Sequence, residues 1–246
     1  VRRILVCIDL TEAVLDEAVR KKADAIVAYH PPIFSPRKSI TDADADIAGA
    51  DTTVNITADI LTINGNQAVA DIETTVKTLS LNTAATEITE TDAVDFAASA
   101  ISSNLTITAG GTIADSGALI VTGTTAATTD VDDKSITLDQ LASTGAVTVN
   151  TQGTTAHVTI DNTTTALGVE GTVNGNLALT SGEAITDSGT LAVCGTTTAT
   201  TDVNDKAITL GTLASTGNVI LSTMGTAGHA TIDNTTTALG VEGTVN

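Results

Sequence analysis

The sequence predicts a mainly β protein, a parallel β-helix (β-solenoid) of repeats preceded by a short N-terminal βαβ unit. Three observations lead to this prediction. Short alternating apolar segments separated by turn residues run through most of the chain, and a 72-residue repeat occupies its second half. Aromatic residues make up only 1% of the sequence and Trp is absent. The core must therefore consist of small aliphatic side chains, which suit thin, regularly stacked coils.

Charge and proline divide the chain near residue 41. Residues 1–41 carry seven basic and five acidic side chains, whereas residues 42–246 carry three basic and 24 acidic ones. All three prolines lie before the division. A surface as acidic as that of the larger region repels phosphate, which argues against nucleic acid and anionic lipid as partners and favours cations.

Residues 1–41 predict a single βαβ unit. The apolar run "ILVCIDL" at 4–10 has the length and composition of a strand covered on both faces. "TEAVLDEAVRKK" at 11–22 has helical periodicity, with Thr11 as a capping residue and basic side chains in the last turn. "ADAIVAYH" at 23–30 is a second buried strand, so the two strands should be parallel.

His30 ends the second predicted strand and is followed by Pro31 and Pro32, which stiffen the backbone. The carboxyl end of a strand in a βαβ unit faces the usual ligand crevice, so His30 is a candidate ligand for a divalent metal ion. A histidine that caps the strand end and bonds to backbone groups fits the same position. The sequence leaves both interpretations open.

The stretch "IDLTEAVLDEAVRKKADAIVAYHPPIFSPRKSIT" at 8–41 resembles the NGG-interacting-factor-three-like family, also labelled GTP cyclohydrolase I type 2 homologues. The resemblance implies an α/β fold, oligomeric rings and two metal ions held by His and carboxylate side chains. His30 is the one ligand that carries over, and Tyr29 stands where many members have a second histidine. We find no counterpart of the later ligands after Thr41. The unit is therefore either a cap on the first coil or the remnant of a fusion.

A sequence repeat with a period of 72 residues dominates the rest of the chain. The segment "IDNTTTALGVEGTVN" occurs at 160–174 and again, unchanged, at 232–246. We place the two copies at 104–175 and 176–246, and we interpret residues 42–103 as degenerate coils of the same kind.

Each copy contains three-residue alternating segments about ten residues apart, the pattern of short strands. In the first copy these segments are "LTI" (105–107), "LIV" (119–121), "ITL" (136–138), "VTV" (147–149), "VTI" (158–160) and "LGV" (167–169). The spacing predicts roughly three coils per copy, with Val, Ile and Leu inward and Thr, Asn and Ser outward. A row of small sandwich domains is the competing architecture, but such domains prefer longer strands and a bulky core residue.

Acidic turns are the main candidates for ligand binding in the repeats. "DVDD" at 130–133 and "DVND" at 202–205 place carboxylates where a calcium ion can sit between coils. Solvated acidic turns explain the same residues, and the spacing is not that of an EF-hand. His157 and His229 lie one repeat apart as single residues, which favours outward or ladder positions over a metal site.

Several functional classes find no support in the sequence. No run of about 18 apolar residues could span a membrane. The start "VRRILVCIDLTEA" turns acidic too soon after its apolar run for a signal peptide. Cys7 and Cys194 lack metal-ligand spacing, and Cys194 takes the place of Thr122 in the other copy, which suggests a structural thiol.

The sequence favours a non-enzymatic, structural or adhesin-like β-solenoid that carries an incomplete metal-hydrolase-family element. Its repeats resemble those of filamentous-haemagglutinin-like bacterial surface proteins, which implies cell-surface or matrix ligands and an extracellular location. The alternative is a cytoplasmic, metal-binding, hydrolase-like protein with His30 as a ligand. An enzyme needs a complete set of ligands in a pocket, whereas a solenoid needs only its ladders. Open solenoid ends also predict self-association.

Overall fold

The computed structural model describes residues 4–9, 12–23, 25–30, 39–41, 47–48, 56–65, 68–163, 165–235 and 239–245. The chain forms two compact units, residues 1–37 and 38–246. Further divisions near residues 41, 103 and 175 stay predictions from the sequence. No helix within the described residues is long and apolar enough to cross a membrane.

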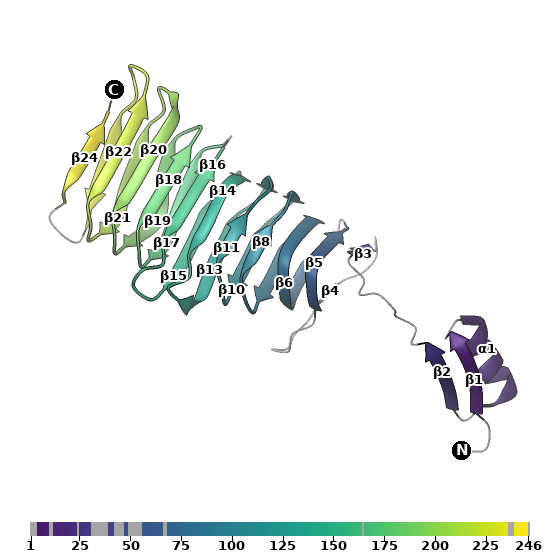
Figure 1. Ribbon diagram of the computed structural model, residues 1–246. Helices are drawn as coiled ribbons and strands as arrows, with labels where there is room; N and C mark the ends of the chain where they lie inside the picture. The colour runs from purple at the N-terminus through teal and green to yellow at the C-terminus, as the bar shows by residue number, and fades with distance from the viewer. Residues whose placement is uncertain are drawn as a thin grey trace. The chain divides into compact units, whose positions relative to one another are not determined.

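The first unit is a βαβ element, as predicted. It comprises β1 (Ile4–Asp9), α1 (Glu12–Lys21) and β2 (Ala25–His30), and the two strands pair in parallel (Figure 1). Basic residues close the last turn of α1, where they complement the helix dipole. Lys21 Nζ also lies 2.6 Å from Glu17 Oε1, one turn earlier in the helix.

The second unit holds 22 strands in a single sheet, and every strand pairing described in it is parallel. The strands before the first repeat copy are β3 (Ser39–Thr41), β4 (Ile47–Ala48), β5 (Ile56–Asn64), β6 (Val69–Thr83), β7 (Thr86–Glu90), β8 (Val94–Phe96) and β9 (Ser99–Ile101). Those that begin in the first copy are β10 (Leu105–Ala109), β11 (Ile113–Asp115), β12 (Leu119–Val121), β13 (Thr125–Asp132), β14 (Ile136–Ser143), β15 (Val147–Gln152), β16 (Val158–Asn162) and β17 (Leu167–Val173). Those of the second copy are β18 (Leu177–Ser181), β19 (Ile185–Val193), β20 (Thr197–Asn204), β21 (Ile208–Ser215), β22 (Val219–Met224), β23 (Ala230–Asn234) and β24 (Val241–Thr244).

These strands wind into a β-solenoid of about nine turns, which confirms the predicted fold class. Each strand pairs with the strand one coil before it and the strand one coil after it. Leu105 in β10, for example, lies between Thr86 in β7 and Thr125 in β13. The coils therefore stack along the axis of the second unit, and parallel ladders join them (Figure 1).

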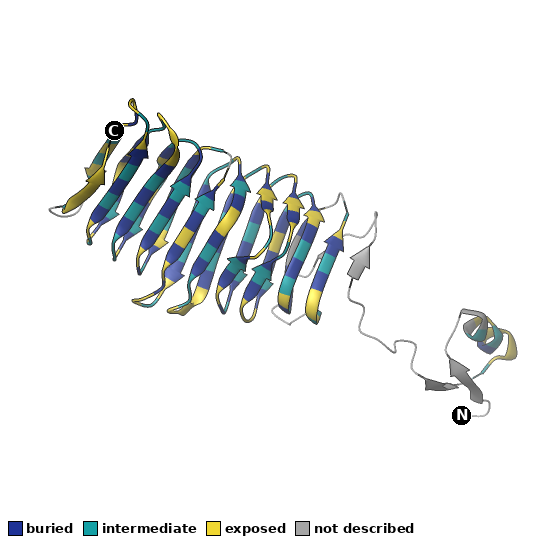
Figure 2. Ribbon diagram, turned by 45° about the horizontal axis from the view of Figure 1, so that its top comes forward, coloured by how far each residue is buried: buried dark blue, intermediate teal, exposed yellow. Residues whose placement is uncertain are grey.

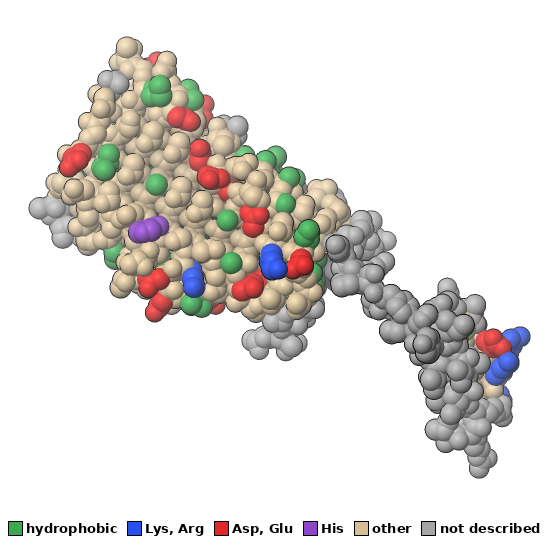
Figure 3. Space-filling view, in the orientation of Figure 1, with side chains coloured by type: hydrophobic (Ala, Val, Ile, Leu, Met, Phe, Trp, Pro, Cys, Tyr) green, Lys and Arg blue, Asp and Glu red, His purple; other side chains and the backbone are tan. Residues whose placement is uncertain are grey.

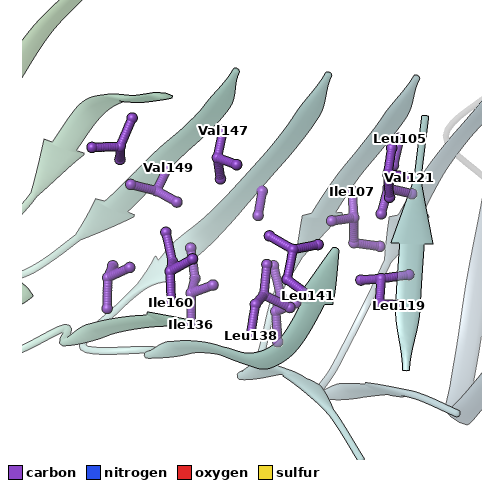
Figure 4. Packing of buried hydrophobic residues seen from close by; sticks show 14 of the residues in the cluster. Leu105, Ile107, Leu119, Val121, Ile136, Leu138, Leu141, Val147, Val149 and Ile160 are labelled. Atoms are coloured by element: carbon purple, nitrogen blue, oxygen red, sulfur yellow. The ribbon is translucent and has the colours of Figure 1, made fainter. Parts of the chain in front are cut away.

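Alternate side chains along each strand point into a continuous aliphatic core. Burial alternates residue by residue, as the bands of colour along the strands of Figure 2 show. Leu105, Ile107, Leu119 and Val121 pack inside the coil in Figure 4 and are at most 1% exposed. Phe96 also fits this bore and is completely buried. The predicted pattern of aliphatic residues inward and polar residues outward is confirmed.

All six segments predicted in the first copy lie at the start of strands, but most of these strands are longer than predicted. The sequence pattern missed β13, whose inward-facing residues are Thr125, Ala127 and Thr129. Small and polar side chains at inward positions weaken the alternation of hydrophobicity on which strand prediction depends. The hydroxyl of Thr125 is accommodated because it donates to Ser143 Oγ at 3.1 Å.

One 72-residue copy spans slightly more than three coils. Thr125 lies in the ladder that continues through Val147 and Val169. Thr197, its equivalent in the second copy, lies in another ladder, next to Leu177 and Val219. Equivalent residues of the two copies therefore face different sides of the solenoid, and the repeat gives no straight column of identical surface features.

Candidate functional site

His30, the predicted metal ligand, is the last residue of β2 and pairs in register with Asp9 of β1. The two residues thus lie at the same carboxyl end of neighbouring parallel strands, where ligands commonly bind. Histidine and aspartate are both donors for divalent metals. The sequence reasoning did not single out Asp9, although its place at the end of a predicted strand was visible. His30 as a metal ligand stays a prediction.

A complete metal site has not been found in the described part of the chain. Within those residues, no three His, Cys, Asp or Glu side chains come together in a group that could hold a metal ion. The register of β1 and β2 supplies two residues of suitable type, but the resemblance implies a larger ligand set. We therefore derive no catalytic step from a bound metal.

The acidic turns of the repeats act as clamps between coils. Asp133 Oδ1 accepts hydrogen bonds from the backbone N–H groups of Thr154 and Thr155, both at 2.8 Å. These bonds favour the charged carboxylate and lower the pKa of Asp133. Asp205, its equivalent, accepts the N–H groups of Thr226 and Ala227 at 2.9 and 2.8 Å. Both copies thus use this aspartate structurally, while calcium at the remaining acidic side chains stays a prediction.

The histidines and the cysteine of the repeats are exposed at the surface. His157 Nδ1 accepts a hydrogen bond from the backbone N–H of Asn176 at 2.9 Å, so its ring bridges two coils. His229 Nδ1 lies 3.3 Å from the carbonyl oxygen of Ala227. Cys194 is free and its thiol lies 3.8 Å from Asn174 Oδ1. Each of these side chains contacts polar groups nearby, in keeping with the surface positions expected for the histidines.

Two buried carboxyl groups were not found by sequence reasoning. Asp115 is 4% exposed and accepts the backbone N–H groups of Asp139 at 2.7 Å and Gln140 at 3.2 Å. Glu90 is 1% exposed and accepts the Thr74 hydroxyl at 2.6 Å. Burial raises the pKa of each group to about 7, against the opposing effect of these hydrogen bonds. Their inward placement follows from strand register, which the sequence pattern did not resolve.

A depression of about 360 Å³ lies over the ends of β6, β9 and β12. Its lining combines an aliphatic side chain with hydroxyl and amide groups: Gly65, Asn82, Thr83, Ala100, Ile101, Ser102, Ile120 and Thr122. These groups can hold a polar ligand weakly. None of them is an acid, base or nucleophile of the kind used in hydrolysis, apart from the unactivated hydroxyls.

Comparisons with known proteins match the two parts of the chain to two families. The family described as Duf34/NIF3 (NGG1p interacting factor 3) matches residues 1–62, which confirms the resemblance found in the N-terminal stretch. The family described as Repeats of unknown function (DUF5649) matches residues 82–151 and 154–212. These repeat matches cover just over half of the chain. No solved structure gives a significant match.

Similar curated proteins align only with the N-terminal part. NIF3-like protein 1 of Mus musculus is 70% identical over 33 residues, which are 13% of this chain and 9% of that protein. The GTP cyclohydrolase 1 type 2 homolog of Bacillus subtilis (strain 168) is 44% identical over 41 residues, or 17% of this chain and 11% of that protein. The chain thus spans about a tenth of the length of these relatives.

Proposed function

Since the chain belongs to the family of Repeats of unknown function (DUF5649), we propose that it works as a non-enzymatic, structural or adhesin-like solenoid. In this proposal the βαβ unit is an incomplete element of the Duf34/NIF3 family and supplies no catalysis. The repeats supply a long, regular surface on which ligands of a cell surface or an extracellular matrix bind.

The continuous core carries this proposal. Buried aliphatic residues from Leu61 in β5 to Leu221 in β22 belong to one cluster, so the coils form a single packed rod rather than separate beads. Successive coils are also joined by parallel backbone ladders. Neighbouring coils stabilise one another in such a stack, and the stack can lengthen by repetition. This is the property that a structural or adhesive stalk needs.

The surface of the solenoid supports polar rather than apolar partners. Exposed hydrophobic side chains on the face seen in Figure 3 stand singly among polar groups and carboxylates. Residues 42–246 carry 24 acidic and three basic side chains. We therefore propose partners with cationic or hydroxyl-rich surfaces, and not nucleic acid. An extracellular or cell-surface location belongs to the same proposal.

Adhesion of the full chain tests this function. We expect the purified protein to bind saturably to at least one surface coated with cells or with extracellular-matrix protein, above the level on albumin. Binding should weaken as salt is raised, because screening reduces the attraction of the acidic rod for cationic groups. His30→Ala should bind as the parent does. Binding no stronger than to albumin on every surface would reject the adhesive role.

The alternative function is metal-dependent, hydrolase-like chemistry centred on His30. The register of His30 with Asp9 and the match to the Duf34/NIF3 family favour it. Metal analysis of the full chain decides between the two: the alternative predicts about one equivalent of zinc, iron or manganese, lost in His30→Ala. His157→Ala is the matched control, because that ring already bonds to Asn176. Our proposal expects both variants and the parent to carry no stoichiometric metal.

A further inference from the structure

The last coil of the solenoid, formed by β23 and β24, leaves one side open. We call residues 230–235 and 239–245 the terminal edge. Every residue of β24 is exposed, and the strand at the C-terminal end of Figure 2 is coloured accordingly. β24 pairs with β22 on one side, and the described residues contain no strand on its other side.

An identical segment inside the solenoid shows what this edge lacks. Residues 160–174 have the same sequence as residues 232–246. Val169 and Val173 are fully buried, whereas their equivalents Val241 and Val245 are 55% and 49% exposed. Because the sequences are the same, the difference comes only from the coil that covers the internal segment.

The covering coil has a defined chemistry. It consists of β18 and β19, which set Leu179 beside Ile160, Ile185 beside Leu167 and Val193 beside Val173. Backbone groups pair across the same boundary, as where Leu167 N–H donates to the Ala184 carbonyl at 2.8 Å. The terminal edge therefore fits an extended strand that presents aliphatic side chains at alternate positions.

The terminal edge lacks the usual protection against strand pairing. Natural edge strands are commonly blocked by Lys, Pro or a bulge. Residues 230–246 contain no Lys, Arg or Pro, and their only charged side chains are Asp233 and Glu242. A strand from a second molecule can approach β24 without meeting a cation or a missing N–H group.

We propose that the terminal edge binds a second copy of this chain, with the two β24 strands antiparallel about a twofold axis. A register centred on Gly243 sets Val241 against Val245 of the second copy, so the exposed valines cover each other. Glu242 then lies opposite Thr244 and not opposite another Glu242, which avoids direct repulsion between like charges. A twofold contact of this kind closes after two molecules and gives a dimer rather than a fibre. The inference goes beyond the proposed adhesive function and does not depend on it.

Sedimentation equilibrium of the 246-residue chain tests the dimer. We expect a reversible monomer–dimer equilibrium that Val241→Lys weakens by about tenfold or more, since the lysines would face the opposing valines and one another. Val131→Lys is the matched control, because Val131 is 45% exposed but lies at the end of β13, away from the edge. That variant should dimerise as the parent does.

A second variant covers the edge instead of charging it. Residues 175–193 are repeated after Asn246, so that the added coil can pack on 232–246 as β18 and β19 pack on 160–174. We expect this extended chain to be monomeric. A parent chain that stays monomeric up to its solubility limit would overturn the proposal. So would a dimer that survives both Val241→Lys and the extension.

Discussion

At the scale of single residues, the buried carboxyl groups are the least conventional feature of the solenoid. Glu90 and Asp115 lie at inward positions where a charge is poorly solvated, and burial raises the pKa of each to about 7. Their hydrogen bonds to hydroxyl and backbone donors offset only part of this cost. Each group therefore links the stability of the coils to pH.

We predict that the solenoid loses stability as pH rises from about 4 to about 7. The folded chain holds protons on Glu90 and Asp115 that the unfolded chain has released, so the stabilisation is complete below the unfolded pKa and disappears through the folded one. One pKa unit corresponds to about 1.4 kcal/mol, which puts an upper limit of about 4 kcal/mol on each group. Urea unfolding followed by circular dichroism at pH 5 and pH 8 measures the difference.

Asp115→Asn tests the assignment to one residue. The amide cannot ionise, so the difference between the two urea midpoints should shrink. Asp187→Asn is the matched control, because Asp187 accepts the corresponding backbone N–H groups of Gly211 and Thr212 and is less buried. An unchanged pH dependence in Asp115→Asn would assign the effect to other groups.

At the scale of strands and turns, buried side-chain amides fix where one strand ends and the next begins. Asn162 at the end of β16 is fully buried, and its Oδ1 accepts the Ser143 N–H at 2.8 Å. Its Nδ2 donates to the Ser143 carbonyl at 3.1 Å and to Thr165 Oγ1 at 2.8 Å. One asparagine thus satisfies backbone groups of two coils at a turn where the ladder shifts register.

We predict that Asn162→Ala lowers the free energy of unfolding by about 1–3 kcal/mol, because it leaves buried backbone groups of Ser143 without partners. Asn234 makes the same two bonds to Ser215, at 2.8 and 3.1 Å, but lies in the open last coil and is only partly buried. Asn234→Ala should therefore cost less than half as much. Thermal and urea unfolding of both variants measure the losses, and equal losses would contradict the role assigned to burial.

At the scale of the whole molecule, the sequence period and the coil period differ. The copies repeat every 72 residues, but Thr125 and Thr197 lie in different ladders. Features that recur in the sequence, such as His157 and His229, are therefore set on different sides of the rod. This spreads similar chemistry around the solenoid instead of concentrating it on one face, which suits a scaffold better than a single binding site.

The fold class could be predicted because local patterns determine it. Alternating residues such as Leu105 and Ile107 specify strands, and the lack of bulky side chains specifies a narrow bore. The N-terminal unit was equally clear, since the helix and both strands are continuous in the sequence. The candidate site was predicted less well: His30 was found from its local context, whereas its neighbour Asp9 and the buried Asp115 depend on pairing between distant strands.

By itself, the sequence determined the solenoid, the βαβ unit and the repeat, because all three are written in patterns shorter than one coil or in direct identity. Only the tertiary structure decided which residues meet between coils. Two identical segments, 160–174 and 232–246, show this most clearly: one is buried and the other forms an open edge. Burial depends on what the neighbouring coil contributes, so no local sequence pattern can specify it.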